Sequence, residues 1–156
     1  MNHAWTPEIK NELDAIVAKY ETKRAPILEI LRTLQERFGY ITKETEAAVG
    51  KYLEIPAINV REVMTFYTLF YAKPRGKKCL RVCRTLTCAL LGAADLVEHA
   101  EQKLGIKAGE TTPDGEYSLY AVECLGACEI APMMQVDDDE YVGAVTKEKI
   151  DQVIKR

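Results

Sequence analysis

The sequence lacks the marks of several functional classes. No apolar run approaches the roughly 18 residues that a membrane-spanning helix needs, so we expect no insertion into a bilayer. Lys and Arg form no run or stripe, and the formal net charge is −3, which argues against a nucleic-acid partner. The 156 residues are 47% hydrophobic, so the chain can nevertheless bury a core of ordinary size.

Signals for export and for catalysis are also missing. The first eight residues contain no basic region followed by an apolar stretch, so we expect no secretory signal and a cytoplasmic protein. There is no G-x-G-x-x-G and no Walker loop, and hence no sign of a nucleotide site in this chain. No acid/base pair, no hydroxyl nucleophile with a base and no C-x-x-C motif stands out, so we expect no catalytic residues.

The most informative feature that is present is a pattern of cysteines. Four of the five cysteines form two close pairs: Cys83 and Cys88 enclose four residues, Cys124 and Cys128 enclose three, and 35 residues separate the pairs. In a reducing compartment such pairs bind metal more often than they form disulfides. Two local pairs of thiolates, brought together by folding, are typical of a metal centre held by four sulfurs.

The hydrophobic pattern predicts an α+β protein in two parts. Residues 1–72 predict a small bundle of four amphipathic helices, with starts at Thr6-Pro7, Pro26 and Thr42 and a stop at Gly39. A polar, turn-rich stretch follows at 73–78, and we place the domain boundary there. Residues 73–156 predict a compact α/β domain with strands over 79–83, 117–123, 133–136 and 141–145 and helices over 89–104 and 147–155.

Each cysteine pair begins where a predicted strand ends. Cys83 closes the first strand and Cys124 follows the second, with Cys88 expected before the next helix and Cys128 in the loop. If the two strands are neighbours, both loops leave the sheet at one edge and the four thiolates can converge. A two-iron cluster needs two sulfurs on each iron, which two short loops can supply.

The residues leave three interpretations of the four cysteines open. An iron–sulfur cluster is the first. A structural zinc ion is the second, although zinc-binding pairs commonly enclose two residues and no histidine lies near either pair. Disulfides or free thiols are the third. We interpret the fifth cysteine, Cys79, as an inert, partly buried thiol, and the acidic turn at 137–140 as solvated.

The chain resembles a known family over nearly its whole length. The match is carried by Cys83-x4-Cys88, by Cys124-Leu125-Gly126-Ala127-Cys128-Glu129-x-Ala131-Pro132, and by the stretches 38–41, 63–67 and 113–115. These motifs resemble those of the thioredoxin-like [2Fe–2S] ferredoxin subunits of NADH-oxidising complexes. The pattern is most similar to the small iron–sulfur component of bacterial NADH:quinone oxidoreductase, the counterpart of the 24 kDa subunit of complex I.

The resemblance implies a fold, a cofactor and a partner. It implies a helical bundle followed by a thioredoxin-like domain, and one [2Fe–2S] cluster on Cys83, Cys88, Cys124 and Cys128. It also implies that a larger partner subunit carries FMN and oxidises NADH, and that the cluster accepts an electron from that flavin. The complex would lie in the cytoplasm or at the cytoplasmic face of the membrane, as part of a peripheral arm.

Two further expectations follow from the resemblance. Pro132 matches the cis-proline position of thioredoxin-like folds, so we predict a cis peptide bond there. The complex that the subunit serves stays open, because soluble NAD-linked or bifurcating hydrogenases and formate dehydrogenases use similar small subunits. From a different class, a zinc-stapled assembly subunit that carries no electrons remains the alternative.

Overall fold

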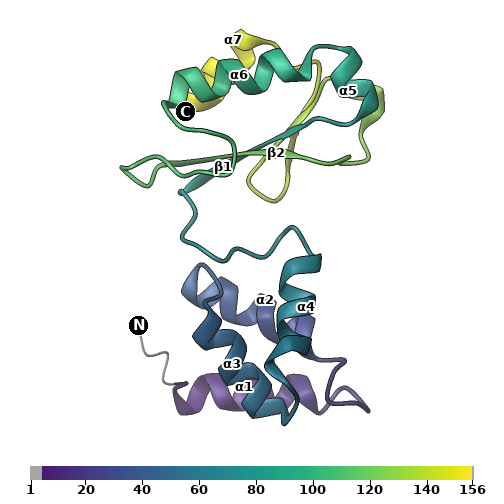
Figure 1. Cartoon of the computed structure of the whole chain (residues 1–156), viewed down its shortest axis with the longest axis vertical. Coiled ribbons are helices and arrows are strands. Elements are labelled where there is room, and N and C mark those ends of the chain that lie inside the picture. The colour runs from purple at the N-terminus through teal and green to yellow at the C-terminus, as the bar shows by residue number, and fades with distance from the viewer. Residues whose placement is uncertain (1–4, 156) are drawn as a thin grey trace. The chain divides into compact units, whose positions relative to one another are not determined.

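The computed structural model describes residues 5–155 and divides the chain into two compact units, Met1–Pro74 and Arg75–Arg156. Helices and a four-stranded mixed sheet make up these units, which confirms the α+β class (Figure 1). No helix within residues 5–155 has the length and apolar character needed to cross a bilayer.

The N-terminal unit consists of four short helices. They are α1 (Pro7–Val17), α2 (Ile27–Phe38), α3 (Lys43–Leu53) and α4 (Ala57–Phe66). The expected start and stop signals are confirmed. The Thr6 hydroxyl accepts a hydrogen bond from the Ile9 N–H, Thr42 accepts one from Thr45, and Gly39 ends α2 in a left-handed conformation.

The apolar faces of these helices form one core. Side chains from all four helices, and Ile41 between α2 and α3, are almost completely buried in it. The helical side chains are those of Ile9, Leu13, Ile16, Ile27, Ile30, Leu31, Leu34, Val49, Leu53, Val60 and Met64. Burial of this apolar surface stabilises helices that are too short to persist alone in water.

The second unit is a mixed sheet with helices. Its elements are β1 (Lys78–Cys83), α5 (Leu86–Leu90), α6 (Ala93–Leu104), β2 (Tyr117–Val122), a 3-10 turn (Cys128–Ile130), β3 (Met134–Val136), β4 (Glu140–Val142) and α7 (Lys147–Lys155). The strand order is β2-β1-β3-β4, with β1 parallel to β2 and the other two pairs antiparallel.

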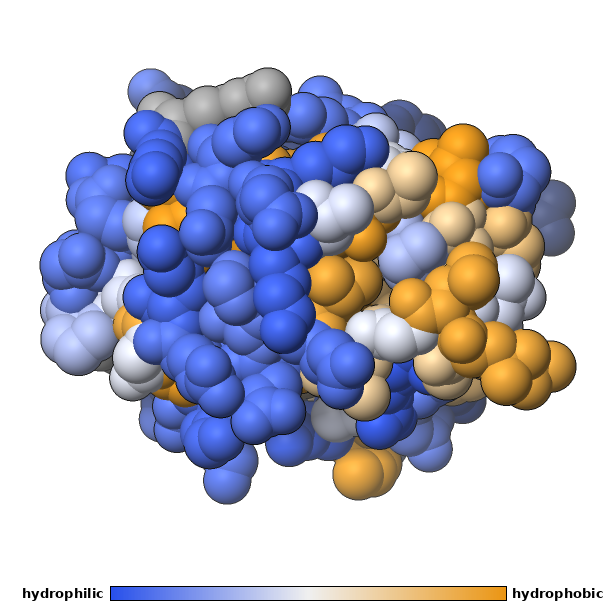
Figure 2. Space-filling view, turned by 90° about the horizontal axis from the view of Figure 1, so that it is seen from above, coloured by the Kyte–Doolittle hydropathy of each residue, from blue (hydrophilic) through white to orange (hydrophobic). Residues whose placement is uncertain are grey.

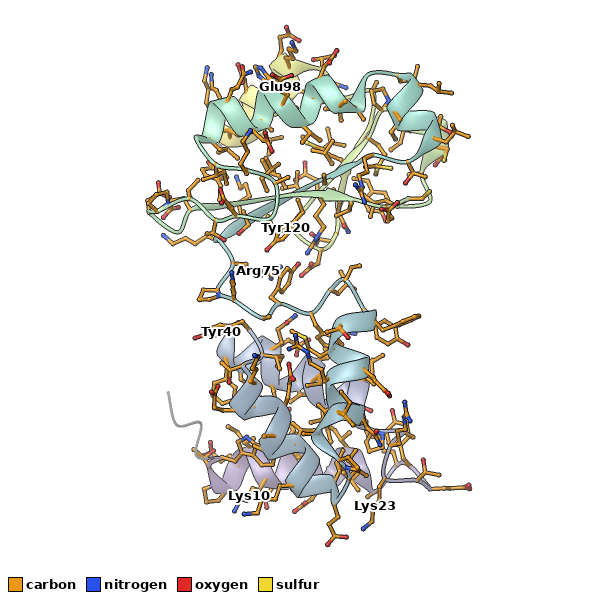
Figure 3. The ribbon with its side chains drawn as sticks, in the orientation of Figure 1. Lys10, Lys23, Tyr40, Arg75, Glu98 and Tyr120 are labelled. Atoms are coloured by element: carbon orange, nitrogen blue, oxygen red, sulfur yellow. The ribbon has the colours of Figure 1, made fainter. Side chains whose placement is uncertain are left out.

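Helices α6 and α7 cover the same face of this sheet (Figure 1). Leu80 and Val82 of β1 point to that face and share a core with Leu96 of α6 and Ile150 of α7. Tyr120 of β2 extends from the opposite face, as Figure 3 shows. The alternation of side chains along β1 therefore separates an apolar, helix-covered face from a more polar one.

The prediction of one helix over 89–104 is wrong in its extent. The structure breaks it into α5 and α6, because Gly92 adopts φ +87°, a left-handed conformation that cannot continue an α-helix. The break gives α5 its own direction. Cys88, expected in a loop before the helix, lies within α5.

The acidic turn expected to be solvated is partly bound to a buried cation. Arg81 of β1 is only 4% exposed and donates to the carbonyl oxygen of Asp137, and its second guanidinium nitrogen lies 2.9 Å from Asp138 Oδ1. The Asp137 carboxylate accepts from the Cys79 N–H at 2.9 Å. The acidic residues thus satisfy a buried arginine, which a charge run in the sequence does not reveal.

Candidate metal centre

The two cysteine-bearing loops leave the sheet side by side. In the parallel ladder Cys83 of β1 pairs with Val122 of β2, so both strands end at the same edge. The Arg84 N–H donates to the Val122 carbonyl at 2.9 Å, and the Arg84 guanidinium lies 2.6 Å from the Glu123 carboxylate. These bonds join the first residue after Cys83 to the two residues before Cys124. The adjacency expected of the two strands is present.

The first pair of cysteines is buried. Cys83 is 3% exposed at the end of β1, and Cys88 is 2% exposed on the inward side of α5. Their thiols form a hydrogen bond to each other. The turn between them places Thr85 at the start of α5 and returns the chain, so that both sulfurs lie in one small apolar cluster with Ala93, Ala127 and Met133.

The second pair is exposed. Cys124 lies two residues after the end of β2, and its sulfur accepts a hydrogen bond from the Gly126 N–H at 3.4 Å. Cys128 begins the 3-10 turn and is also exposed. Gly126 adopts φ +76°, so the tight turn that folds the backbone back on Cys124 depends on glycine.

Contacts from Leu125, Cys128 and Met133 bring the second loop, and the segment after it, against the first. The Leu125 N–H donates to the Cys83 sulfur, and Cys128 lies close enough to Cys88 to act on its charge. Met133 contributes both of its backbone groups: its N–H donates to the Cys88 sulfur and its carbonyl accepts from the Cys83 N–H at 3.2 Å. The Ala131–Pro132 bond beside it is cis, as predicted.

The environment shifts the pKa values of the two buried thiols in opposite directions. Burial raises the pKa of Cys83, but N–H groups of Thr85 and Leu125 and the Cys88 thiol outweigh burial and lower that pKa below its ordinary value. Burial is also the largest influence on Cys88 and raises its pKa, because only the Met133 N–H opposes it while Cys83 and Cys128 add to it. One sulfur of the buried pair is therefore prepared to carry negative charge.

The donor set fits an iron–sulfur cluster. Thiolate sulfur is the ligand that such clusters take, and backbone N–H groups directed at sulfur are the outer contacts that tune them. The structure places two sulfurs in contact on the first loop and two on the neighbouring loop. Within residues 5–155 no three Cys, His, Asp or Glu side chains already surround a single point as ligands of one metal ion would.

The structure reveals an apolar surface beside the site that motif reasoning missed. Leu86, Leu90 and Leu91, on and directly after α5, are 72%, 79% and 54% exposed. We call these three residues the leucine patch. Figure 2 shows a polar surface over most of the view and an apolar area at the side where α5 lies. The sequence carries a signal for this surface, because Leu86, Leu90 and Leu91 all lie within three residues of Cys88.

The remaining candidates lie away from a ligand position. Cys79 is completely buried in β1, as expected of an inert thiol, and none of the five cysteines forms a disulfide. His99 of α6 lies 3.0 Å from the Asp151 carboxylate of α7 and so links two helices. Neither residue is among those that the two loops bring together.

Comparison with known proteins agrees with these observations. A family model described as "Thioredoxin-like [2Fe-2S] ferredoxin" matches residues 13–156. The chain is 40% identical over 147 residues to a protein of Rhizobium meliloti named as a subunit of NADH-quinone oxidoreductase, covering 94% of this chain and 87% of that protein. It is 39% identical over 144 residues to NADH-quinone oxidoreductase subunit 2 of Thermus thermophilus, covering 91% and 80%.

A solved structure shows the same fold at lower identity. The chain aligns with a NAD+-reducing [NiFe]-hydrogenase in the air-oxidised state at a TM-score of 0.67 and 18% identity, covering 80% of this chain. The alignment spans only 22% of that larger hydrogenase chain. At this identity the likeness concerns the fold.

Proposed function

Because the chain belongs to the thioredoxin-like [2Fe–2S] ferredoxin family, we propose that it is the electron-transfer subunit of an NADH dehydrogenase module of the complex I type. In this proposal Cys83, Cys88, Cys124 and Cys128 hold one [2Fe–2S] cluster. The cluster, when bound, exchanges one electron at a time with the FMN of a partner subunit that oxidises NADH. This chain has no catalytic site of its own and acts as a carrier.

One observation carries the proposal. The parallel strands β1 and β2 end together, and the loop after each supplies one cysteine pair, with the Leu125 N–H of the second loop donating to Cys83 of the first. A cluster of two irons takes two sulfurs on each iron, and this edge offers two sulfurs from each loop. The relatives, named as subunits of NADH-quinone oxidoreductase, favour the complex I assignment.

The protein's own residues would perform two tasks at the cluster. The small apolar cluster around Met133 excludes water from Cys83 and Cys88. The N–H groups of Thr85, Leu125, Gly126 and Met133 donate to sulfur and favour its negative charge. Domain 73–156 thus binds and tunes the cluster, while the bundle of residues 1–72 is the helical extension of the subunit.

The leucine patch provides a docking surface for the flavin subunit. Exposed leucines gain free energy when a partner covers them, and three of them lie within three residues of Cys88. A partner that buries the patch is thereby brought close to the proposed cluster, which electron transfer requires. The assembly would form part of a peripheral arm at the cytoplasmic face of the membrane.

A related assembly is the second candidate. The fold likeness to a NAD+-reducing hydrogenase fits a small iron–sulfur subunit of a soluble NAD-linked or bifurcating hydrogenase or formate dehydrogenase. The identity of about two residues in five to the oxidoreductase subunits favours complex I. Identification of the subunits that co-purify with a tagged chain distinguishes the two candidates.

Electron transfer from the flavin subunit tests the proposal directly. The tagged chain is co-expressed with the FMN-containing subunit of its own organism, and the anaerobic complex is mixed with NADH while its visible absorption is followed. We expect the absorption of the cluster to decrease by the amount that corresponds to uptake of about one electron per chain. A Cys88→Ser complex should show reduction of the flavin only. Flavin reduction without any bleaching in the unmodified complex would contradict the proposal.

A further inference from the structure

Tyr141 connects the outer hairpin to the second cysteine loop. It lies on β4 and is 48% exposed, yet its hydroxyl donates a hydrogen bond to the carbonyl oxygen of Leu125 at 3.3 Å. Leu125 is the residue between Cys124 and Gly126. A side chain on a strand at the edge of the sheet thus reaches the backbone of the loop that carries a proposed ligand.

The bonded carbonyl belongs to the peptide unit that faces a sulfur. The Leu125 carbonyl and the Gly126 N–H form one planar peptide, in which the two groups point in opposite directions when the bond is trans. The Gly126 N–H donates to the Cys124 sulfur at 3.4 Å, so Tyr141 and Cys124 are bound to opposite sides of the same peptide. The hydroxyl, the peptide and the sulfur form a continuous chain of hydrogen bonds.

We propose that Tyr141 is a positioning residue that holds the Leu125–Gly126 peptide so that its N–H is directed at the Cys124 sulfur. A hydrogen bond accepted by the carbonyl polarises the peptide and strengthens its N–H as a donor. The residue acts through the peptide and does not itself contact the sulfur. The inference rests on the proposed function, because Cys124 is a ligand only if the chain binds the cluster.

The exposed position of the loop makes this contact important. Cys124 and Gly126 are exposed, whereas the Leu125 side chain packs against the small apolar cluster that surrounds the first pair. Packing therefore holds the Leu125 side chain but leaves the Gly126 end of the peptide open to solvent. The bond from Tyr141 is longer than the usual 2.7–2.8 Å of an O–H···O bond, which indicates a modest effect.

The test compares two tyrosines that make the same kind of bond. Tyr141→Phe removes the hydroxyl and keeps the ring. Tyr117→Phe is the matched control, because the Tyr117 hydroxyl donates to the backbone carbonyl of Ile154, away from both cysteine loops. The first readout is the midpoint potential of the full-length chain carrying its cluster, followed by the paramagnetic resonance of the reduced form. The second is the hydrogen-exchange rate of the Gly126 amide in the full-length chain without the cluster.

Tyr141→Phe is expected to change both readouts and Tyr117→Phe neither. N–H···S hydrogen bonds stabilise the more negative, reduced cluster, so their weakening lowers the potential. At a fixed ambient potential near the midpoint, we expect the ratio of reduced to oxidised chains to fall about twofold, since one bond in such a chain strengthens the next by about a fifth. The Gly126 amide should exchange several-fold faster.

An unchanged potential or an unchanged Gly126 exchange rate in Tyr141→Phe would overturn the inference, as would equal changes in Tyr117→Phe. Absence of a cluster from the unmodified chain would instead contradict the proposed function. In that case the Gly126 exchange rates of the two variants still decide whether Tyr141 holds this peptide.

Discussion

Cys83 and Cys88 are buried in an apolar cluster, whereas Cys124 and Cys128, which leave the same edge of the sheet, are exposed. The first loop is held by the core on one side and by helix α5 on the other. The second is held by hydrogen bonds from Gly126 and Tyr141, by the ion pair between Arg84 and Glu123, and by Ala127, whose side chain is buried in the same cluster. The difference indicates that the two loops have different roles in the proposed site.

The buried loop provides a fixed, water-free half of the proposed site, and the exposed loop provides the half that a partner can approach. The leucine patch lies on and directly after α5, so the buried loop also carries an exposed apolar surface within three residues of Cys88. Substitutions in the two loops are therefore expected to have different effects.

The largest expected effect is loss of the cluster from the buried pair. In Cys88→Ser a hard oxygen replaces sulfur where packing prevents adjustment, so iron and sulfide content should fall nearly to zero. Cys124→Ser should retain several-fold more iron, because its exposed loop can shift to bring the oxygen to the metal.

Chemical analysis of iron and sulfide in anaerobically purified variants measures this difference. Cys79→Ala is the control, and it should keep the iron content of the unmodified chain because Cys79 lies apart from both loops. Equal loss from Cys88→Ser and Cys124→Ser would remove the distinction between the loops.

The next largest effect concerns docking. Leu90→Glu places a charge in the leucine patch without disturbing a buried residue, and we expect binding to the flavin subunit to weaken at least about tenfold, with the fold intact. Gln102→Glu adds the same charge on the exposed polar side of α6 and should bind normally. Titration calorimetry measures both affinities, and unchanged binding of Leu90→Glu would place the interface elsewhere.

The thiols of the exposed loop should react with maleimide about tenfold faster than those of the buried loop, because buried thiols react only after local opening. In the cluster-free chain, maleimide should modify Cys124 and Cys128 quickly and Cys79, Cys83 and Cys88 slowly. Mass spectrometry of peptides from a time course assigns each site. Rapid modification of Cys88 would show that the first loop is open in solution.

The smallest expected effect tests how β1, which carries the first loop, is anchored. Although partial burial opposes it, the Arg81 guanidinium, together with Arg75, holds the pKa of Asp138 below its usual value. Because this pKa is depressed on folding, the pair stabilises the protein at neutral pH, and the contribution disappears as pH falls below 4 through the lowered pKa.

Asp138→Asn should cost about 1 kcal/mol at pH 7, a small value because the carboxylate is exposed and screened. Urea unfolding at several pH values measures it. The two proteins should become equally stable at low pH, and a difference that persists there would assign another role to Asp138.

Much of the site follows from the sequence because strand ends and cysteine spacing are local features. The placement of Cys83 at the end of β1 and the caps at Thr6 and Thr42 were predicted from neighbouring residues and are confirmed. The cis bond at Pro132 was predicted from the family resemblance and is also confirmed. The family resemblance is likewise confirmed.

The features that the sequence did not reveal depend on distant parts of the chain. Arg81 meets Asp137 and Asp138 only because β1 and β3 pair in one register, so the sequence did not reveal that part of this otherwise exposed acidic turn binds a buried arginine. The break at Gly92 was missed because the apolar period continues across it. The assignment of all four cysteines as ligands of one cluster stays a prediction.

Metal and sulfide analysis of the chain purified without oxygen tests the central claim most directly. We predict a coloured protein with about two irons and two acid-labile sulfides per chain, which takes up one electron to give a paramagnetic state. A colourless protein that contains one zinc ion and no sulfide would contradict the account and would select a structural role for the same four cysteines.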